Sequence, residues 1–139
     1  MQILVFTING NYYGLDTKYI DEVIVRQKLT PIPNSSDCVA GMTYVRESCY
    51  TCIDLSNTLF KERSKWAVTQ KFLLTSYGSR YISYIVDEVV GVYTVGVEQV
   101  KSNNVFGVDK TLLAGFIFEK NKIITLLDLN GINQASSCW

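Results

Sequence analysis

The chain has 139 residues, with 13 basic and 13 acidic side chains, and 47% of its residues are hydrophobic. This size and composition predict one folded domain with its own core and argue against disorder. The neutral balance lacks the basic footprint of a nucleic-acid-binding protein and the polybasic cluster of a membrane-surface protein.

The sequence contains no histidine. This absence removes the commonest general base and the commonest metal ligand, so Ser-His-Asp, Cys-His and histidine-based zinc sites are excluded. No apolar run approaches the roughly 20 residues needed to cross a bilayer, and residues 1–6 lack the basic region of a signal peptide. We therefore expect a cytosolic protein with no direct membrane insertion.

Short β-rich runs separated by turn residues dominate the first half of the chain. Asn9-Gly10 predicts a hairpin turn, because both residues accept a positive φ. Asp16 is expected to cap a helical turn that ends at Tyr19, and a serine at 35 or 36 to cap a brief helix over residues 38–40. One or two further helical turns are expected over residues 55–60. The strands predicted in this half are residues 2–8, 12–15, 22–27, 41–46 and 49–53.

The same pattern begins again after a charged connector at residues 61–65. A turn is expected at residues 77–79, a helical turn over residues 97–100, and a polar loop over residues 101–109. The strands predicted in this half are residues 71–77, 80–86, 89–95, 112–118 and 122–127.

An internal repeat underlies this pattern. Residues 41–55, GMTYVRESCYTCIDL, align without a gap on residues 115–129, GFIFEKNKIITLLDL, so that Asp54 falls on Asp128. The turn at residue 10 likewise matches the turn at residue 78, and the run Asp-Glu-Val occurs at residues 21–23 and again at 87–89. Each half, about residues 1–62 and about 66–133, is too short for a comfortable domain of its own. Two small barrels or curled sheets that share one core are therefore expected, within a single domain spanning residues 1–139.

The four cysteines are Cys38, Cys49, Cys52 and Cys138. The spacing Cys49-x-x-Cys52 is typical of metal and redox sites, but a zinc site of four thiolates needs two close pairs and this chain has one. The pair lies in a predicted strand, where residues three apart point to opposite faces. The second copy of the repeat has plain apolar residues at both positions. We interpret the cysteines as small structural core residues, with no metal and no cofactor.

The ordered series of motifs resembles the CheW family of bacterial chemotaxis coupling proteins, from about residue 3 to residue 131. No single motif is specific, but their order along the chain is. They are Tyr-Gly-Leu-Asp at 13–16, Ile-Asp-Glu-Val-Ile at 20–24, Thr-Pro-Ile-Pro-Asn at 30–34, Gly41, Arg46, Ile-Asp-Leu at 53–55, Ile-Val-Asp-Glu-Val at 85–89 and Leu-Leu-Asp-Leu at 126–129.

The resemblance implies an all-β fold of two pseudo-symmetric five-stranded SH3-like barrels around a shared hydrophobic core. It also implies a non-enzymatic adaptor. Its partners would be the regulatory domain of a CheA-type histidine kinase and the cytoplasmic tip of methyl-accepting chemoreceptors, in arrays at the inner membrane. The sequence leaves open whether the protein also associates with copies of itself in rings.

Arg46 is the first candidate for partner binding. It falls on the arginine of the family's Asn-Leu-Arg-Gly turn, and arginine is favoured at interface hot spots. The family's Asn and Gly are replaced here by Tyr44 and Glu47. Without that glycine a turn with positive φ is harder to form, and Glu47 is placed to neutralise Arg46. Val45, next to Arg46, is a further candidate.

The remaining candidates also follow from the resemblance. Ile20, Glu22 and Val23 match the segment that borders the family's binding groove, although core packing is an equally good interpretation of Ile20 and Val23. Gly41 matches a family glycine at a strand start where chain segments approach closely. Backbone geometry explains this glycine more simply than direct contact with a partner. Two residues of the second half, Val86 and Val92, are assigned to the surface that meets the kinase.

Three other functions are alternatives to this adaptor. The first is a CheW-like adaptor of a non-flagellar pathway such as twitching motility. The second is a small nucleic-acid-binding β-barrel, which the neutral charge disfavours. The third is an enzyme, disfavoured by the missing histidine and by the lack of a phosphate-binding G-x-x-x-x-G-K-[ST] loop. The carboxylates of Asp54 and Asp128 precede predicted helical turns or turns, so capping rather than catalysis is expected of them.

Overall fold

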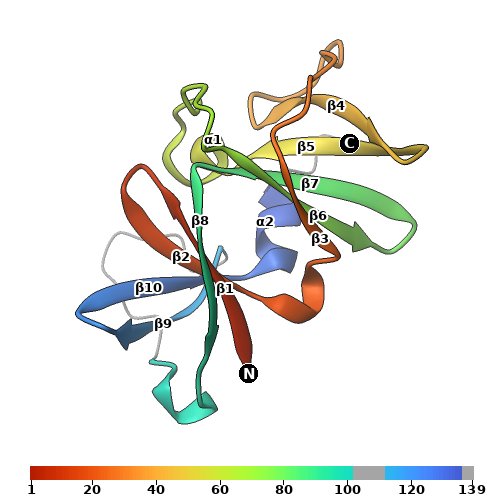
Figure 1. The fold of residues 1–139 in the computed structure, drawn as a ribbon. Coiled ribbons are helices and arrows are strands. Elements are labelled where there is room, and N and C mark those ends of the chain that lie inside the picture. Colours follow the sequence, from red (N-terminus) through yellow and green to blue (C-terminus); the bar gives the residue numbers. More distant parts are fainter. Residues whose placement is uncertain (102–111, 136–139) are drawn as a thin grey trace.

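The computed structural model describes residues 1–101 and 112–135, in which ten strands form two five-stranded sheets (Figure 1). The first sheet has the strand order β8-β1-β2-β10-β9 and the second the order β3-β6-β7-β5-β4. The strands are β1 (Gln2–Ile8), β2 (Asn11–Asp16), β3 (Glu22–Val25), β4 (Val39–Val45), β5 (Ser48–Asp54), β6 (Lys71–Tyr77), β7 (Arg80–Val86), β8 (Glu88–Thr94), β9 (Leu113–Glu119) and β10 (Lys122–Leu127). The helical segments are η1 (Thr17–Tyr19), α1 (Leu55–Phe60), η2 (Val97–Gln99) and α2 (Leu129–Ala135).

The two sheets have the same architecture. Each strand of the first half corresponds to the strand numbered five higher in the second half, so that β1 corresponds to β6. Exchanging the corresponding strands converts one strand order into the other. The neighbouring strands β2 and β10 run parallel, as do β5 and β7, while the other pairs are antiparallel. The repeat in the sequence is therefore a pseudo-two-fold repeat of structure.

Each sheet takes strands from both halves of the chain. The hairpin β1–β2 lies in the sheet with β8, β9 and β10, and the hairpin β6–β7 lies in the sheet with β3, β4 and β5. The division into residues 1–62 and 66–133 thus marks the two repeats but does not separate the two sheets. The parallel pairs β2–β10 and β5–β7 are what join each hairpin to the other half.

Both sheets curl on themselves and close. Thr30, in the segment after the edge strand β3, pairs with Met42 of the opposite edge strand β4; Lys101 pairs with Phe116 of β9 in the same way. Gly41 lies beside the first closure, with φ of 147°. A Cβ atom there would lie 2.8 Å from the carbonyl oxygen of Thr30, so only glycine allows the chain segments to approach so closely.

The core has three parts. One cluster packs among strands of the first sheet, and another packs among strands of the second, around Phe72 and Leu74. The third and largest lies between the sheets and includes Leu73 of β6 and Ile132 of α2. Alternate residues of β6 thus enter different clusters, as the period of two in a strand requires. The all-β prediction of two five-stranded barrels around a shared core is confirmed, and Figure 1 shows α2 between the two sheets.

Two local expectations differ from the structure. Residues 38–40 are not helical: β4 begins at Val39, which pairs with Ile53 of β5, so sheet pairing overrides the capping signal of Ser35 and Ser36. The helix α2 was not expected. The expected loop at residues 101–109 lies outside the described residues after residue 101, and Cys138 also lies outside them.

Candidate protein-binding surface

The turn between β4 and β5 presents Arg46 at its tip. Arg46 has φ of 45° and Glu47 has φ of 72°, so both central residues are left-handed, as in a type I′ hairpin turn. The turn therefore forms without the family's glycine. The equivalent turn between β9 and β10 has the same geometry at Lys120 and Asn121, with φ of 50° and 64°.

Arg46 pairs with Glu22 across the two edge strands of the second sheet. Its guanidinium donates a hydrogen bond to Glu22 Oε1, and the side chains are 68% and 39% exposed. Two candidate binding residues are thus brought together, although 24 positions separate them in the sequence. The expected neutralisation by Glu47 is replaced by pairing with Glu22. An ion pair this exposed stabilises the fold by only about 0.2–1 kcal/mol, which leaves both groups free to exchange partners.

A polar and aromatic cluster surrounds this ion pair. The rings of Tyr50 and Tyr81 lie 5.3 Å apart between centroids, on β5 and β7. The carboxylate of Asp21, just before β3, accepts a hydrogen bond of 2.7 Å from Ser76 Oγ of β6. The pKa of Tyr50 is raised by burial, and further by Asp21 and Tyr81, while Arg46 lowers it. The sequence did not mark these residues as candidates for partner binding, although Asp21 belongs to the repeated run Asp-Glu-Val.

Exposed apolar side chains lie next to the pair along the chain. Val23 is 37% exposed on β3, and Tyr44, two residues before Arg46, is 70% exposed. Val45 is half-buried against the core of the second sheet, and Ile20 is half-buried against the shared core. The surface thus combines an exchangeable ion pair with exposed apolar area, the composition that suits a protein interface. We call Glu22, Val23, Tyr44 and Arg46 the Arg46 surface.

Besides the half-buried Ile20 and Val45, three candidates lie outside this surface. Val86 is fully buried in the shared core, so its assignment to a kinase-facing surface is wrong: β7 is covered on both faces. Gly41 is buried, and its close approach to Thr30 explains it by backbone geometry alone. Val92 is 56% exposed, but on β8, the edge strand of the first sheet.

The cysteines have the arrangement that the strand predicts. Cys49 is exposed, Cys52 of the same strand is completely buried, and both are thiols without a disulfide. Burial raises the pKa of the Cys52 thiol to about 12, so this thiol is protonated at neutral pH and a poor nucleophile. Within residues 1–101 and 112–135, no three cysteine or carboxylate side chains are grouped so that they could hold a metal ion.

The two suspected catalytic carboxylates have structural roles. Asp54 caps α1, since one of its oxygens accepts the amide of Ser56 at 3.1 Å and the other accepts the amide of Ser64 at 2.9 Å. Asp128 accepts the amide of Gly131 at 3.3 Å at the start of α2. The capping prediction is confirmed for both. None of the helices in the described residues is long and apolar enough to cross a membrane.

Comparison with known proteins supplies the family. The family model described as "CheW-like domain" matches residues 2–136. The chain belongs to the CheW-like domain family. The Klebsiella aerogenes protein named "Chemotaxis protein CheW" is 25% identical to this CheW-like domain over 107 residues, which are 77% of this chain and 64% of that protein. The Bacillus subtilis protein of the same name is 22% identical, over 98% of this chain and 88% of that protein.

A solved structure agrees with the fold of this CheW-like domain. The crystal structure of the scaffolding protein TtCheW from Thermoanaerobacter tengcongensis superimposes with a TM-score of 0.84 at 22% identity, covering 92% of this chain and 84% of that chain. At this identity the likeness supports the double-barrel fold, and the family match supports the place of the chain among CheW-like domains.

Proposed function

We propose that this CheW-like domain is a non-enzymatic adaptor that couples chemoreceptors to a CheA-type histidine kinase and helps to assemble their signalling arrays. Its partners are the kinase's regulatory domain and the cytoplasmic tips of the receptors, so it acts in the cytoplasm at the inner membrane. The observation that carries the proposal is the family match over nearly the whole chain, together with the Arg46 surface.

The Arg46 surface suits an adaptor for a physical reason. Arg46 is held by a weak, exposed pair with Glu22, so a carboxylate on a partner can replace Glu22 at little cost. The guanidinium then makes two parallel hydrogen bonds to the new carboxylate, which fixes orientation as well as affinity. Because an adaptor binds two partners at once, each contact can be modest while the assembly is stable.

The test is a calorimetric titration of the purified chain with the regulatory domain of a CheA-type kinase, with and without a receptor-tip fragment. Micromolar binding to the kinase domain, and a ternary complex when the receptor fragment is added, is the expected result. Binding to neither partner contradicts the proposal.

The Arg46 surface is tested by Arg46→Glu, which should weaken binding to at least one partner by about 1–3 kcal/mol. The free energy of unfolding should fall by no more than about 1 kcal/mol, because the exposed pair with Glu22 is lost. The matched control is Lys120→Glu, because Lys120 occupies the equivalent turn position of the other barrel, with a φ of 50° against 45° for Arg46. Unchanged affinity of Arg46→Glu for both partners removes the Arg46 surface from the proposal, and an equal loss in Lys120→Glu shows that charge alone is responsible.

A further inference from the structure

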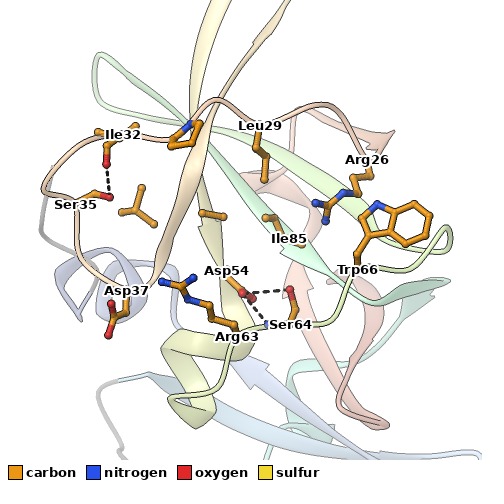
Figure 2. Close-up of a pocket in the computed structure, with 13 residues that line it drawn as sticks. Arg26, Leu29, Ile32, Ser35, Asp37, Asp54, Arg63, Ser64, Trp66 and Ile85 are labelled. Carbon is orange, nitrogen blue, oxygen red and sulfur yellow. Dashed lines mark hydrogen bonds between the residues drawn. The ribbon is translucent and has the colours of Figure 1, made fainter.

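The second sheet has a cavity at the end of its barrel away from Arg46. Its volume is about 450 Å³, and Leu29, Val39 and Ile85 form its apolar lining (Figure 2). A neighbouring hollow of about 360 Å³ shares Arg26 and Trp66 with this cavity and extends along Val25 and Val68. The two hollows adjoin at the side chains of Arg26 and Trp66, and together we call them the Trp66 groove.

Large apolar side chains are exposed along the groove. Trp66 is 65% exposed, Val25 is 62% exposed and Val68 is 77% exposed. Covering apolar area of this kind is favourable by about 25 cal/mol for each Å² removed from water. Tryptophan is also the residue type most enriched, with tyrosine and arginine, at the energetic centres of protein interfaces. The groove therefore has the anchors of a docking site.

The groove also carries unpaired positive charge. Arg26, Lys28 and Arg63 line it, and Lys65 directly precedes Trp66. Among the described residues the ion pairs are Lys18–Asp16 and Arg46–Glu22, so none of these four cations is neutralised by a carboxylate. Arg26 does donate a hydrogen bond to Gln70 Oε1, which orients its guanidinium beside the indole of Trp66 (Figure 2).

The acidic residues near the groove do not cancel this charge. Asp54 lines the cavity, but it is 5% exposed and its carboxylate already accepts both the amide and the hydroxyl of Ser64, at 2.9 and 3.2 Å. Asp37 and Glu62 are the exposed acids of these segments. The hydrogen bonds to Ser64 leave the charge of Asp54 in place, so four cations stand against three carboxylates. The chain as a whole is neutral, and the groove keeps a local excess of one positive charge.

We propose that the Trp66 groove binds an acidic polypeptide segment of a partner protein, one that places an aliphatic or aromatic side chain in the cavity and carboxylates on its rim. Arg26 and Arg63 hold the carboxylates, for which their planar donors are suited. The ring of Trp66 covers the apolar anchor. A cavity of this size accommodates one or two such side chains.

The cavity of the groove lies away from Arg46. Val39, at the start of β4, lines the cavity, whereas Arg46 follows the end of the same strand at Val45. Seven residues at about 3.3 Å each place Arg46 about 20 Å from the cavity. On β3 the groove adjoins the Arg46 surface, because Val23 and Val25 are two residues apart on one face of the strand. A side chain seated in the cavity leaves Arg46 uncovered, and the groove can be tested without the kinase or a receptor.

The test uses tryptophan fluorescence. The chain has two tryptophans, so the variant Trp139→Phe leaves Trp66 as the only reporter. The probe is the capped hexapeptide Glu-Glu-Leu-Phe-Glu-Glu, and its partner probe replaces every Glu by Lys. The expected result is a saturable change in Trp66 fluorescence with the acidic peptide, with a Kd of about 1 mM or tighter. Raising the salt concentration from about 0.05 to 0.5 M should weaken this binding.

Variants locate the site. The side chain of Arg63 makes no ion pair within residues 1–101 and 112–135, and Arg63→Glu should weaken peptide binding at least about fivefold. Arg26→Glu should do the same, and Lys122→Glu, on the other sheet, should leave binding unchanged. No saturable change up to about 5 mM, equal binding of the lysine peptide, or unchanged binding by Arg63→Glu each overturns the proposal.

A membrane is the competing occupant, because basic and aromatic residues also bind anionic lipid. The same variant is therefore mixed with vesicles of phosphatidylglycerol and phosphatidylcholine. A blue shift of Trp66 fluorescence with vesicles, but no response to the acidic peptide, overturns the proposal in favour of a lipid surface. A response to the peptide without one to vesicles supports it.

Discussion

The turn between β4 and β5 should become more stable when Glu47 is replaced by glycine. Arg46 and Glu47 have φ of 45° and 72°, a region in which a Cβ atom approaches the following carbonyl oxygen. Glycine has no Cβ atom and adopts this conformation without strain. The change Glu47→Gly therefore removes a conformational penalty from the folded protein and leaves the backbone where it is.

The magnitude follows from two opposing contributions. The left-handed conformation costs a residue with a side chain about 1–2 kcal/mol. Glycine loses more conformational freedom on folding, which returns about 0.5–1 kcal/mol of that gain. The net expectation for Glu47→Gly is an increase of about 0.5–1 kcal/mol in the free energy of unfolding, or about 2–4 °C in Tm for a chain of this size.

Urea unfolding followed by circular dichroism measures this effect. The midpoint should rise while the slope m stays the same, because the surface exposed on unfolding does not change. The matched control is Asn121→Gly at the equivalent position between β9 and β10, where φ is 64°. Asparagine tolerates this conformation better than glutamate, so the control should gain less. A loss of stability in Glu47→Gly, or an equal gain in both variants, refutes the reasoning.

Three further effects are expected. Gly41→Ala should destabilise the fold by about 2 kcal/mol or more in urea unfolding, since its Cβ atom would lie 2.8 Å from the carbonyl oxygen of Thr30; a loss below about 0.5 kcal/mol contradicts this. Val86→Ala should cost about 2 kcal/mol and Val92→Ala less than about 0.5, because one side chain is fully buried and the other is 56% exposed; equal losses contradict these positions. The Cys52 pKa is raised from 9.0 to about 12, so its stabilising contribution is complete below pH 9 and is lost as the pH rises toward 12. The free energy of unfolding should fall there by up to about 1.4 kcal/mol per pH unit, and Cys52→Ala should reduce that slope; an unchanged slope contradicts the assignment.

The strands were predictable because their signals are local. The bounds of β1, β6, β7 and β10 agree with the residues predicted as strands, and α1 agrees with the predicted helical turns at residues 55–60. Turn residues such as Asn9-Gly10 mark where each strand ends, and they do so whatever the rest of the chain does. The same reasoning missed α2, although Asp128-Leu129 repeats the Asp54-Leu55 that begins α1.

The exchange of hairpins between sheets was not predictable in this way. Whether β2 pairs with β10 or with a strand of its own half depends on contacts between residues far apart in the chain, for which no local pattern exists. The burial of Val86 has the same origin. A run of apolar residues marks a strand covered on both faces only once its neighbours are known.

The candidate site was only partly predictable for a related reason. Arg46 could be proposed from its place in the motif series, but its pairing with Glu22 requires the barrel to close and bring β3 and the β4–β5 turn together. Tyr50 and Tyr81 meet through the parallel pairing of β5 and β7, which the sequence does not specify.

The exchange of hairpins also governs how the protein acquires its structure during synthesis. The hairpin β1–β2 leaves the ribosome before the other strands of the domain, yet its neighbours β8 and β10 follow more than 70 residues later. The first barrel therefore cannot close until almost the whole chain has emerged, and such distant contacts make folding slow. Cutting the chain at the connector after α1 would leave each fragment with one hairpin of one barrel and three strands of the other. Neither fragment should fold alone, but the two together should reassemble the native domain.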